Sequence, residues 1–149
     1  MRAIVIYDSK HGNTEQIAQA IAAGVAEAGV AVECRKISMS SEEDLRGIDL
    51  WVLGSMTRWG GAPFVLRTLL KNGLKEEGTK SKRGAVFDTR YANMAKGAAE
   101  NLAAIFAKSG VEVIGAEHFT VAALKGPLLE GEAERARAYG VKLGRKLSA

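Results

Sequence analysis

Short apolar runs rich in β-branched residues alternate along the whole chain with longer stretches in which apolar residues recur every three or four positions. The runs predict buried strands, and the longer stretches predict helices that pack against them. We expect five strands, over residues 3–7, 30–37, 48–54, 84–88 and 111–120. Because strands and helices alternate to the end of the chain, the pattern predicts a doubly wound α/β fold, with a parallel sheet covered by helices on both faces.

Capping residues and glycines bound the expected helices. We expect these helices from Thr14 to near Gly29, from Pro63 to Asn72-Gly73, from about Lys96 to Gly110, and after Glu130. Ser40 and Glu43 have the spacing of a capping box, which predicts a short helix that Gly47 closes. Residues 75–82 are expected to form a solvated connection. These elements use the whole length, so we expect one domain over residues 1–149.

The composition limits where the protein works and what chemistry it holds. Cys34 is the only cysteine among 149 residues, which excludes an internal disulfide and a multi-cysteine metal site, and we expect a buried, inert thiol there. The first apolar run is shorter than a signal-peptide core, and no later run approaches the length of a bilayer span. We therefore expect a cytoplasmic protein without a membrane span or a bound metal. Lys and Arg exceed Asp and Glu by 21 to 17, and this formal charge of +4 favours anionic ligands or acidic partners.

The loop after the first expected strand has the residue types of an anion-binding loop. It joins hydroxyl, amide and basic side chains and a glycine to the start of a helix, in the order Ser9, Lys10, His11, Gly12, Asn13, Thr14. The first N–H groups of a helix have no partner within it, and Gly12 allows a backbone with positive φ, so the loop has the donors to enclose a phosphate. The alternative is a capped tight turn, since Ser, Asn and Thr serve that purpose as well.

Two further loops lead to a resemblance that covers nearly the whole chain. The loop over residues 54–63 follows the third expected strand and contains Met56, Thr57, Arg58, Trp59 and Gly60. The fourth strand is followed by Asp88, Thr89, Arg90 and Tyr91. Together with the hydroxyl-rich loop that ends in Gly-Asn-Thr, these segments resemble the phosphate loop and the two ring loops of the short-chain flavodoxins. The resemblance implies a flavodoxin-like sheet of five strands in the order 2-1-3-4-5 and a bound FMN.

The same resemblance implies what each loop binds. Residues 9–14 would hold the FMN phosphate, and residues 56–60 and 88–91 would hold the isoalloxazine ring. Trp59 and Tyr91 are the expected stacking partners of the ring, because an aromatic face offers both apolar area and π contact.

The chain departs from the flavodoxin pattern in its charge and at one loop position. Met56 stands where many relatives have proline, so the geometry of the first ring loop is expected to differ. Flavodoxins are usually acidic around the ring, whereas this chain has basic residues in the same loops, namely Lys10, Arg58, Arg90 and Lys96. A guanidinium close to the reduced ring would make the reduction potential less negative. The alternative is that Arg58 and Arg90 point into water and serve to dock a partner with an acidic face.

Several functions compete for this pattern. The leading interpretation is a flavodoxin, an electron-transfer protein without catalytic side chains that carries one or two electrons between redox partner proteins, as a monomer or weak dimer. The alternative is an FMN-dependent oxidoreductase of the same fold, acting on a quinone, a porphyrinogen or NAD(P)H. A signalling receiver domain would need an aspartate at the end of the third strand, where Gly54-Ser55 stands. A phosphate-binding module without redox activity would not need the aromatic pair, and no specific nucleic-acid binding is expected.

Overall fold

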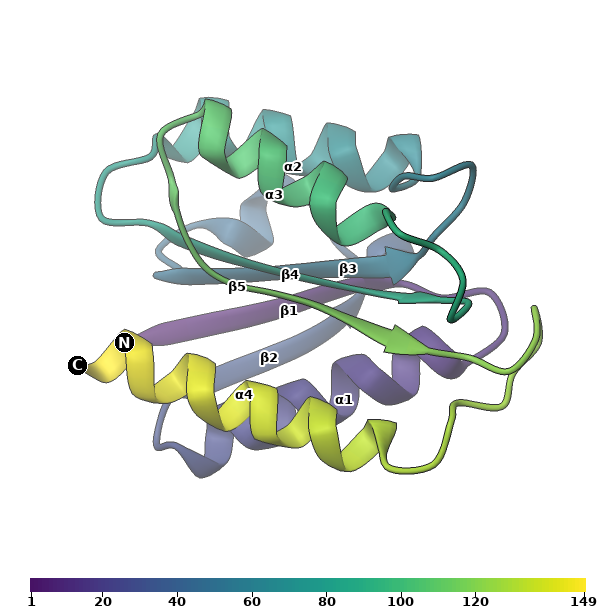
Figure 1. The fold of residues 1–149 in the computed structure, drawn as a ribbon. Coiled ribbons are helices and arrows are strands. Elements are labelled where there is room, and N and C mark those ends of the chain that lie inside the picture. The colour runs from purple at the N-terminus through teal and green to yellow at the C-terminus, as the bar shows by residue number, and fades with distance from the viewer.

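Five parallel strands form the centre of the molecule, in the spatial order β2-β1-β3-β4-β5 (Figure 1). The computed structural model describes residues 1–149, and its strands are β1 (Arg2–Asp8), β2 (Ala31–Lys36), β3 (Leu50–Met56), β4 (Arg83–Arg90) and β5 (Glu112–Thr120). The expected order is confirmed, and each strand bound lies within two residues of its prediction. β1, β3 and β4 are buried along nearly their whole length, as central strands between two helical layers must be.

Two helices cover each face of the sheet (Figure 1). α1 (Asn13–Glu27) and α4 (Glu132–Ser148) lie on one face, and α2 (Phe64–Glu77) and α3 (Ala98–Lys108) lie on the other. Neighbouring strand residues point to opposite faces, so Val5 joins the core under α1 and α4 whereas Ile4 joins the core under α2 and α3. Two short 3-10 turns, η1 (Ile37–Met39) and η2 (Glu42–Leu45), connect β2 to β3. None of the helices combines the length and the apolar character that crossing a bilayer requires.

The expected end of α2 at Asn72-Gly73 is wrong, because the helix continues to Glu77. Gly73 lies inside the helix, where an added Cβ atom would overlap the side chain of Leu45 and stand 3.4 Å from the Trp51 ring. Here the glycine allows close packing of α2 against η2 and β3 instead of ending the helix. The helix stops before Gly78, whose φ is +74°.

Two other boundaries are shifted from their predictions. The short helix between β2 and β3 forms one residue later than expected, as η2, with the Ser41 N–H donating to Asp44 Oδ2 at 2.9 Å. β4 continues two residues beyond the expected end at Asp88, so Thr89 and Arg90 lie in the strand rather than in the loop after it. This second shift decides which way the two side chains point.

Glycines bring α1 and α4 into direct backbone contact. An added Cβ atom at Gly140 of α4 would overlap the carbonyl oxygen of Ile21 in α1. One at Gly24 of α1 would overlap the carbonyl oxygen of Arg137 in α4. A larger residue would not fit at either position. The contact holds α1, and with it the loop that precedes α1, firmly against the rest of the molecule.

Glu132 and Arg135, in the first turn of α4, hold the loop that connects β5 to α4. The Thr120 N–H donates to Glu132 Oε2 at 2.7 Å, and Arg135 donates to both oxygens of Glu132 at 2.9 Å. Arg135 also donates to Glu117 at 2.7 Å, with its guanidinium 4.4 Å from the centre of the Phe119 ring. The hydrogen bonds from Arg135 hold the pKa of Glu132 below its ordinary value of 4.5, although partial burial acts in the opposite direction.

Replacing Gly140 by alanine is expected to lower the free energy of unfolding by about 1–3 kcal/mol, because the added methyl group overpacks the contact between α1 and α4. Alanine is a better helix residue than glycine by about 1 kcal/mol, so helix propensity alone predicts a gain in stability rather than the expected loss. Urea denaturation measures the change. The control is Ala138→Gly at an exposed position of α4, which should cost only about 1 kcal/mol. A Gly140→Ala variant as stable as the parent would contradict the close contact.

The stability that Glu132 contributes is expected to depend on pH. Because its folded pKa lies below 4.5, the contribution is fully present above that pH and is lost as the pH falls through the lower folded pKa. In urea denaturation at a series of pH values, the parent should lose stability below pH 4.5, and Glu132→Gln should lose less. Glu134→Gln, an exposed neighbour in the same turn, should follow the parent curve. Parallel curves for the parent and Glu132→Gln would show that this carboxylate does not hold the loop.

Candidate functional site

A cavity opens at the carboxyl ends of β1, β3 and β4, beside the loop that follows β5. The chain leaves β1 toward β2 and leaves β3 toward β4, so the two connections run to opposite sides of the sheet. Such a point of reversal leaves a crevice at the edge of a parallel sheet, which is the usual place for a ligand. The cavity is lined by Lys10, His11, Asn13, Thr14, Met56, Thr57, Thr89, Arg90, Tyr91, Met94, Val121 and Leu124.

The start of α1 offers three backbone donors that have no acceptor in the protein. Gly12 precedes the helix with a φ of +91°, and the first bond of the helix runs from the Gln16 N–H to the Gly12 carbonyl at 3.1 Å. The N–H groups of Asn13, Thr14 and Glu15 are left without a partner. Free donors and the positive end of the helix dipole both favour negative charge, so this geometry suits a phosphate group.

His11 adds an unpaired polar atom to the same cavity. Its Nε2 is the one buried side-chain nitrogen or oxygen of the chain without a hydrogen-bond partner. Buried polar atoms are rarely left unpaired, so a ligand oxygen beside His11 would satisfy it. On the other side of the loop, Asn13 packs so closely against Gly126 that an added Cβ atom there would stand 2.6 Å from Asn13 Oδ1. The phosphate of FMN fits this set of donors, with the loop after β5 closing one side.

Thr14 and Thr89 link the phosphate loop (residues 9–14) to β4. Their hydroxyl oxygens lie 2.8 Å apart in a hydrogen bond, and both side chains are buried. The Thr14 hydroxyl is therefore engaged with β4. What Thr14 offers to a ligand is its backbone N–H group.

A tight turn after β3 places Trp59 outside the cavity. Arg58 and Gly61 exchange two backbone hydrogen bonds at 3.1 and 2.9 Å. The two residues between them have positive φ, +52° at Trp59 and +76° at Gly60. Such a turn suits glycine or asparagine, and a tryptophan there is an uncommon, strained choice. The indole is fully exposed and does not line the cavity, whereas Tyr91, the other expected stacking residue, does.

The alternative in which Arg90 points into water is wrong. Its guanidinium is buried and donates to the two Asp88 carboxylate oxygens at 2.9 and 2.6 Å, and also to Glu100 of α3. Since β4 continues through Arg90, Asp88 and Arg90 share the face that α3 covers, and Thr89 points to the other face. Two carboxylates therefore oppose the positive charge that was expected to act alone on the ring. Arg58, by contrast, is exposed.

Six expected site residues lie outside the cavity lining, namely Ser9, Gly12, Arg58, Trp59, Gly60 and Asp88. Ser9 accepts the Gly12 N–H at 3.1 Å and so shapes the phosphate loop without facing the cavity. Sequence reasoning does not assign Met94, Val121 and Leu124, which line the cavity. Their place in the chain could have indicated these residues, because the loops after β4 and β5 begin at the same edge of the sheet as the loop after β1.

Solved structures with this fold include free-standing flavodoxins and parts of larger proteins. A flavodoxin from the domain Archaea matches over 100% of both chains with a TM-score of 0.87 and 21% sequence identity. The flavodiiron core from Synechocystis sp. PCC6803 has a TM-score of 0.81 and 24% identity, and the match covers 99% of this chain and 36% of that one. At these identities the likeness shows the fold alone.

Curated relatives with higher identity match only a segment. A diflavin flavoprotein of Nostoc sp. is 41% identical over 70 residues, which are 44% of this chain and 12% of the relative. Another, from Synechocystis sp., is 35% identical over 91 residues, which are 58% of this chain and 15% of the relative. The match thus spans a small part of these longer proteins. A family model described as flavodoxin, however, matches residues 5–139, which is most of the chain. The chain belongs to the flavodoxin family.

Proposed function

We propose that this chain binds FMN noncovalently and carries one or two electrons between redox partner proteins. The observation that supports this proposal most directly is the cavity at the strand ends. There the three free N–H groups of α1 and the unpaired Nε2 of His11 meet a wall that includes threonine and tyrosine side chains. Such a site suits a ligand with an anion at one end and a planar ring at the other. FMN has both, and its isoalloxazine ring supplies redox chemistry that the side chains do not.

The phosphate loop would hold the anionic end. The N–H groups of Asn13, Thr14 and Glu15 and the imidazole of His11 are the proposed donors, with Lys10 adding positive charge nearby. A hydrogen bond to a charged oxygen is worth about 1.5–3 kcal/mol, so several together hold a phosphate without an arginine.

The remaining walls of the cavity would hold the ring. Thr57 and Thr89 supply hydroxyl groups, Tyr91 an aromatic face, and Val121 and Leu124 an apolar wall that excludes water. We retain Trp59 as a proposed second contact of the ring. Its indole is fully exposed on the loop that also supplies Thr57, so covering a bound ring would remove apolar surface from water.

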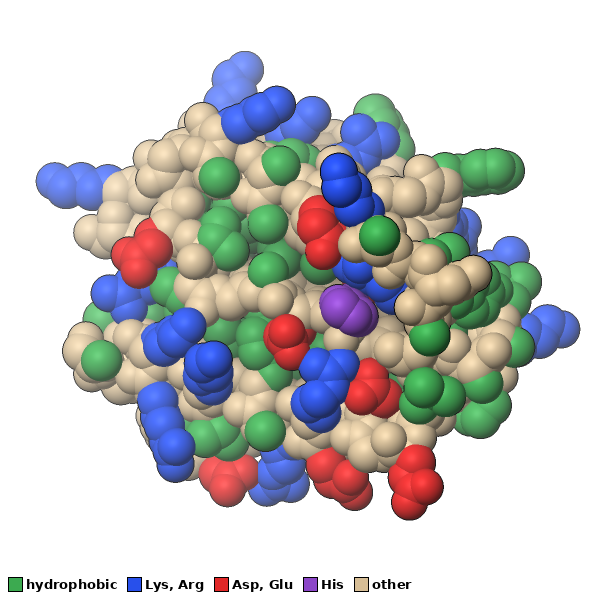
Figure 2. Space-filling model, viewed as in Figure 1, with side chains coloured by type: hydrophobic (Ala, Val, Ile, Leu, Met, Phe, Trp, Pro, Cys, Tyr) green, Lys and Arg blue, Asp and Glu red, His purple; other side chains and the backbone are tan.

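Four exposed basic side chains surround the cavity, one from each of the loops after β1, β3, β4 and β5, namely Lys10, Arg58, Lys96 and Lys125. None of the four forms an ion pair within the chain, and Figure 2 shows basic side chains projecting at this end of the molecule. We propose that this basic rim docks an acidic face of the redox partner.

Cys34 is proposed to take no part in the redox chemistry. It is a free, partly buried thiol on β2. Burial raises the pKa of this thiol to about 11, so it is a poor nucleophile. An unpaired, inert cysteine is compatible with the reducing cytoplasm, where we place the protein.

The parent protein is expected to bind FMN at least about tenfold more tightly than riboflavin, because riboflavin lacks the phosphate. Binding is measured by quenching of flavin fluorescence and by the visible spectrum. Gly12→Ala should weaken FMN binding about tenfold and leave riboflavin binding unchanged. Gly29→Ala is the matched control, since both glycines have positive φ and open space for a Cβ atom, yet Gly29 lies at the far end of α1. Equal affinity of the parent for FMN and riboflavin would contradict the phosphate site.

The same preparation separates the carrier from the FMN-dependent oxidoreductase. An electron carrier should take up electrons from dithionite and return them to a protein or a simple oxidant, without turnover of NAD(P)H and a quinone. Sustained turnover of NAD(P)H with a quinone would overturn the carrier assignment in favour of the oxidoreductase.

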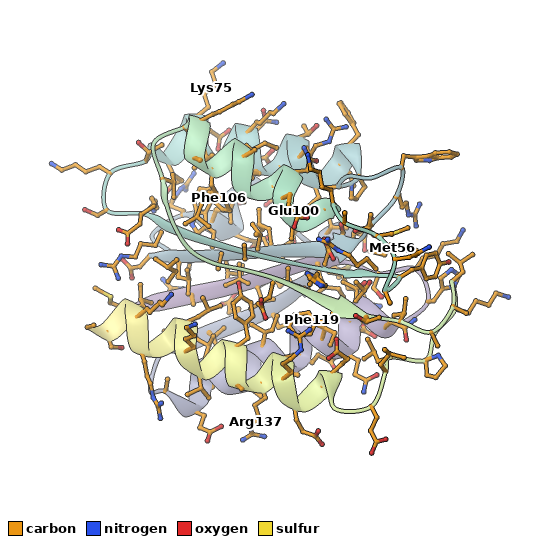
Figure 3. The ribbon with its side chains drawn as sticks, in the orientation of Figure 1. Met56, Lys75, Glu100, Phe106, Phe119 and Arg137 are labelled. Carbon is orange, nitrogen blue, oxygen red and sulfur yellow. The ribbon has the colours of Figure 1, made fainter.

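The basic rim is expected to speed electron transfer from the reduced protein to an anionic oxidant such as ferricyanide, and added salt should slow it. Arg58→Glu should lower the low-salt rate about tenfold in stopped-flow measurements, because it reverses a charge at the rim. Lys75→Glu makes the same change in net charge on α2, far from Met56 at the cavity, as Figure 3 shows. Equal slowing by both substitutions would mean that net charge, and not the rim, governs the encounter.

A further inference from the structure

Two buried side chains of β4 form a bidentate ion pair beside the cavity. Arg90 donates from Nε to Asp88 Oδ1 at 2.9 Å and from Nη2 to Asp88 Oδ2 at 2.6 Å. The exposed fractions of the two side chains are 1% and 0%. Because a buried charge is costly without a partner, the two groups depend on each other.

The start of α3 completes this network. The Ala99 N–H donates to Asp88 Oδ2 at 2.8 Å, and the Ala98 N–H donates to the Thr57 hydroxyl at 3.1 Å. Glu100 accepts from the Gly97 N–H at 2.8 Å and from Arg90. Side chains of the protein thus accept hydrogen bonds from the first N–H groups of α3, whereas the first N–H groups of α1 have no acceptor.

The network connects both ring loops. Thr57 belongs to the loop after β3, and its N–H also donates to the Thr89 carbonyl at 2.9 Å. Thr57 and Arg90 both line the cavity, and Glu100 lies on the sheet face that α3 covers, as Figure 3 shows. Thr57, Asp88, Arg90 and Glu100 are together called the latch below.

Gly97 closes the latch because it has no side chain. An added Cβ atom there would overlap the Thr57 hydroxyl and stand 2.7 Å from Asp88 Oδ2 and 3.1 Å from Arg90 Nε. Its φ is −160°, which any residue adopts, so space alone requires the glycine.

Arg90 is opposed by two carboxylates within this network. Partial burial works against the ionisation of Glu100, but the Gly97 N–H and Arg90 hold its pKa below the ordinary value. The hydrogen bonds to Asp88 raise the pKa of Arg90. The two carboxylates that accept from Arg90 therefore offset its positive charge.

We infer that Arg90 is a positioning residue that joins the two ring loops to α3 before any ligand binds. We also infer that Asp88 and Glu100, which pair with Arg90 outside the cavity lining, reduce the positive charge that Arg90 presents to the ring side of the cavity. This inference rests on the proposed function, since it concerns the flavin ring. Because the ring loops are already ordered, ligand binding does not have to supply the free energy of ordering them. The two carboxylates offset the positive charge of Arg90, so it should favour electron uptake by the ring less than a lone arginine would.

Two substitutions that change the charge of the latch should move the midpoint potential of bound FMN in opposite directions. Glu100→Gln removes a negative charge and should raise the potential, and Arg90→Gln removes the positive charge and should lower it. Glu134→Gln on α4 matches the first change in charge at a remote, exposed position and should leave the potential unmoved. A purely structural role for the latch would not give shifts of opposite sign. Equal potentials in the parent and Glu100→Gln would overturn the charge part of the inference.

A third substitution opens the latch without changing any charge. Gly97→Ala should weaken the binding of FMN and of riboflavin alike, each by about tenfold, because both ligands contain the ring. Gly61→Ala is its control, since the nearest atom to an added Cβ there is Asn101 Oδ1 at 3.4 Å, an ordinary contact. If Arg90→Gln does not fold, Gly97→Ala and Glu100→Gln still test the inference. Unchanged ring affinity in Gly97→Ala would overturn the positioning role.

Hydrogen exchange separates a failure of this inference from a failure of the proposed function. The amides of Ala98 and Ala99 should be protected in the parent without flavin and exchange about tenfold faster in Gly97→Ala. If the parent binds no flavin at all, the proposed function fails, and the exchange rates alone decide whether the latch exists. Unprotected amides in the parent would overturn the latch itself.

Discussion

The structure depends on where the backbone donors at the starts of its helices find acceptors. At the start of α3, the first N–H groups donate hydrogen bonds to the side chains of Thr57, Asp88 and Glu100. α1 begins at Gly12 with three donors unpaired, beside a buried imidazole nitrogen that is also unpaired. Unpaired polar groups at a partly buried site cost free energy, so a ligand bound at the start of α1 would complete the hydrogen bonding of the fold. The glycine contact between α1 and α4 keeps that open end in a fixed place.

Strand alternation in β4 then gives three consecutive residues two different tasks. Asp88 and Arg90 point to the face of α3 and hold the ring loops, whereas Thr89 points to the face of α1 and holds the phosphate loop through Thr14. One strand therefore supports both ends of the cavity. A slip of one residue between β4 and β3 would exchange the two sets of side chains, so the pairing of these strands fixes the chemistry of the site.

The order of elements and the place of the cavity follow from the sequence, because buried apolar runs and loop residues are local signals. The environments of Gly73, Arg90 and Trp59 could not be predicted from the local sequence. Gly73 has the residue type of a helix stop, and only its contact with Leu45 shows that it lies in the helix interior. Arg90 lies in the expected loop until β4 extends by two residues and turns it toward Glu100. The exposure of Trp59 depends on a turn whose backbone angles no residue pattern specifies. Each of these outcomes is set by tertiary contacts or backbone geometry rather than by local composition.

The charges around the cavity act at two different ranges. The basic rim is exposed, so salt screens it beyond a Debye length of about 8–10 Å at physiological ionic strength, and a docking partner meets it first. The Asp88–Arg90 pair is buried beside the cavity, where solvent and salt screen it far less. The charges of this pair oppose each other, and the side chain of Glu100, which adds the second carboxylate of the latch, is half exposed. Salt would therefore still weaken part of the effect of the latch on a bound ring. Added salt should therefore weaken docking more than it changes the field at the ring. On the proposed function, the rim residues would mainly affect partner docking and the latch residues the reduction potential, although both groups lie around the same cavity.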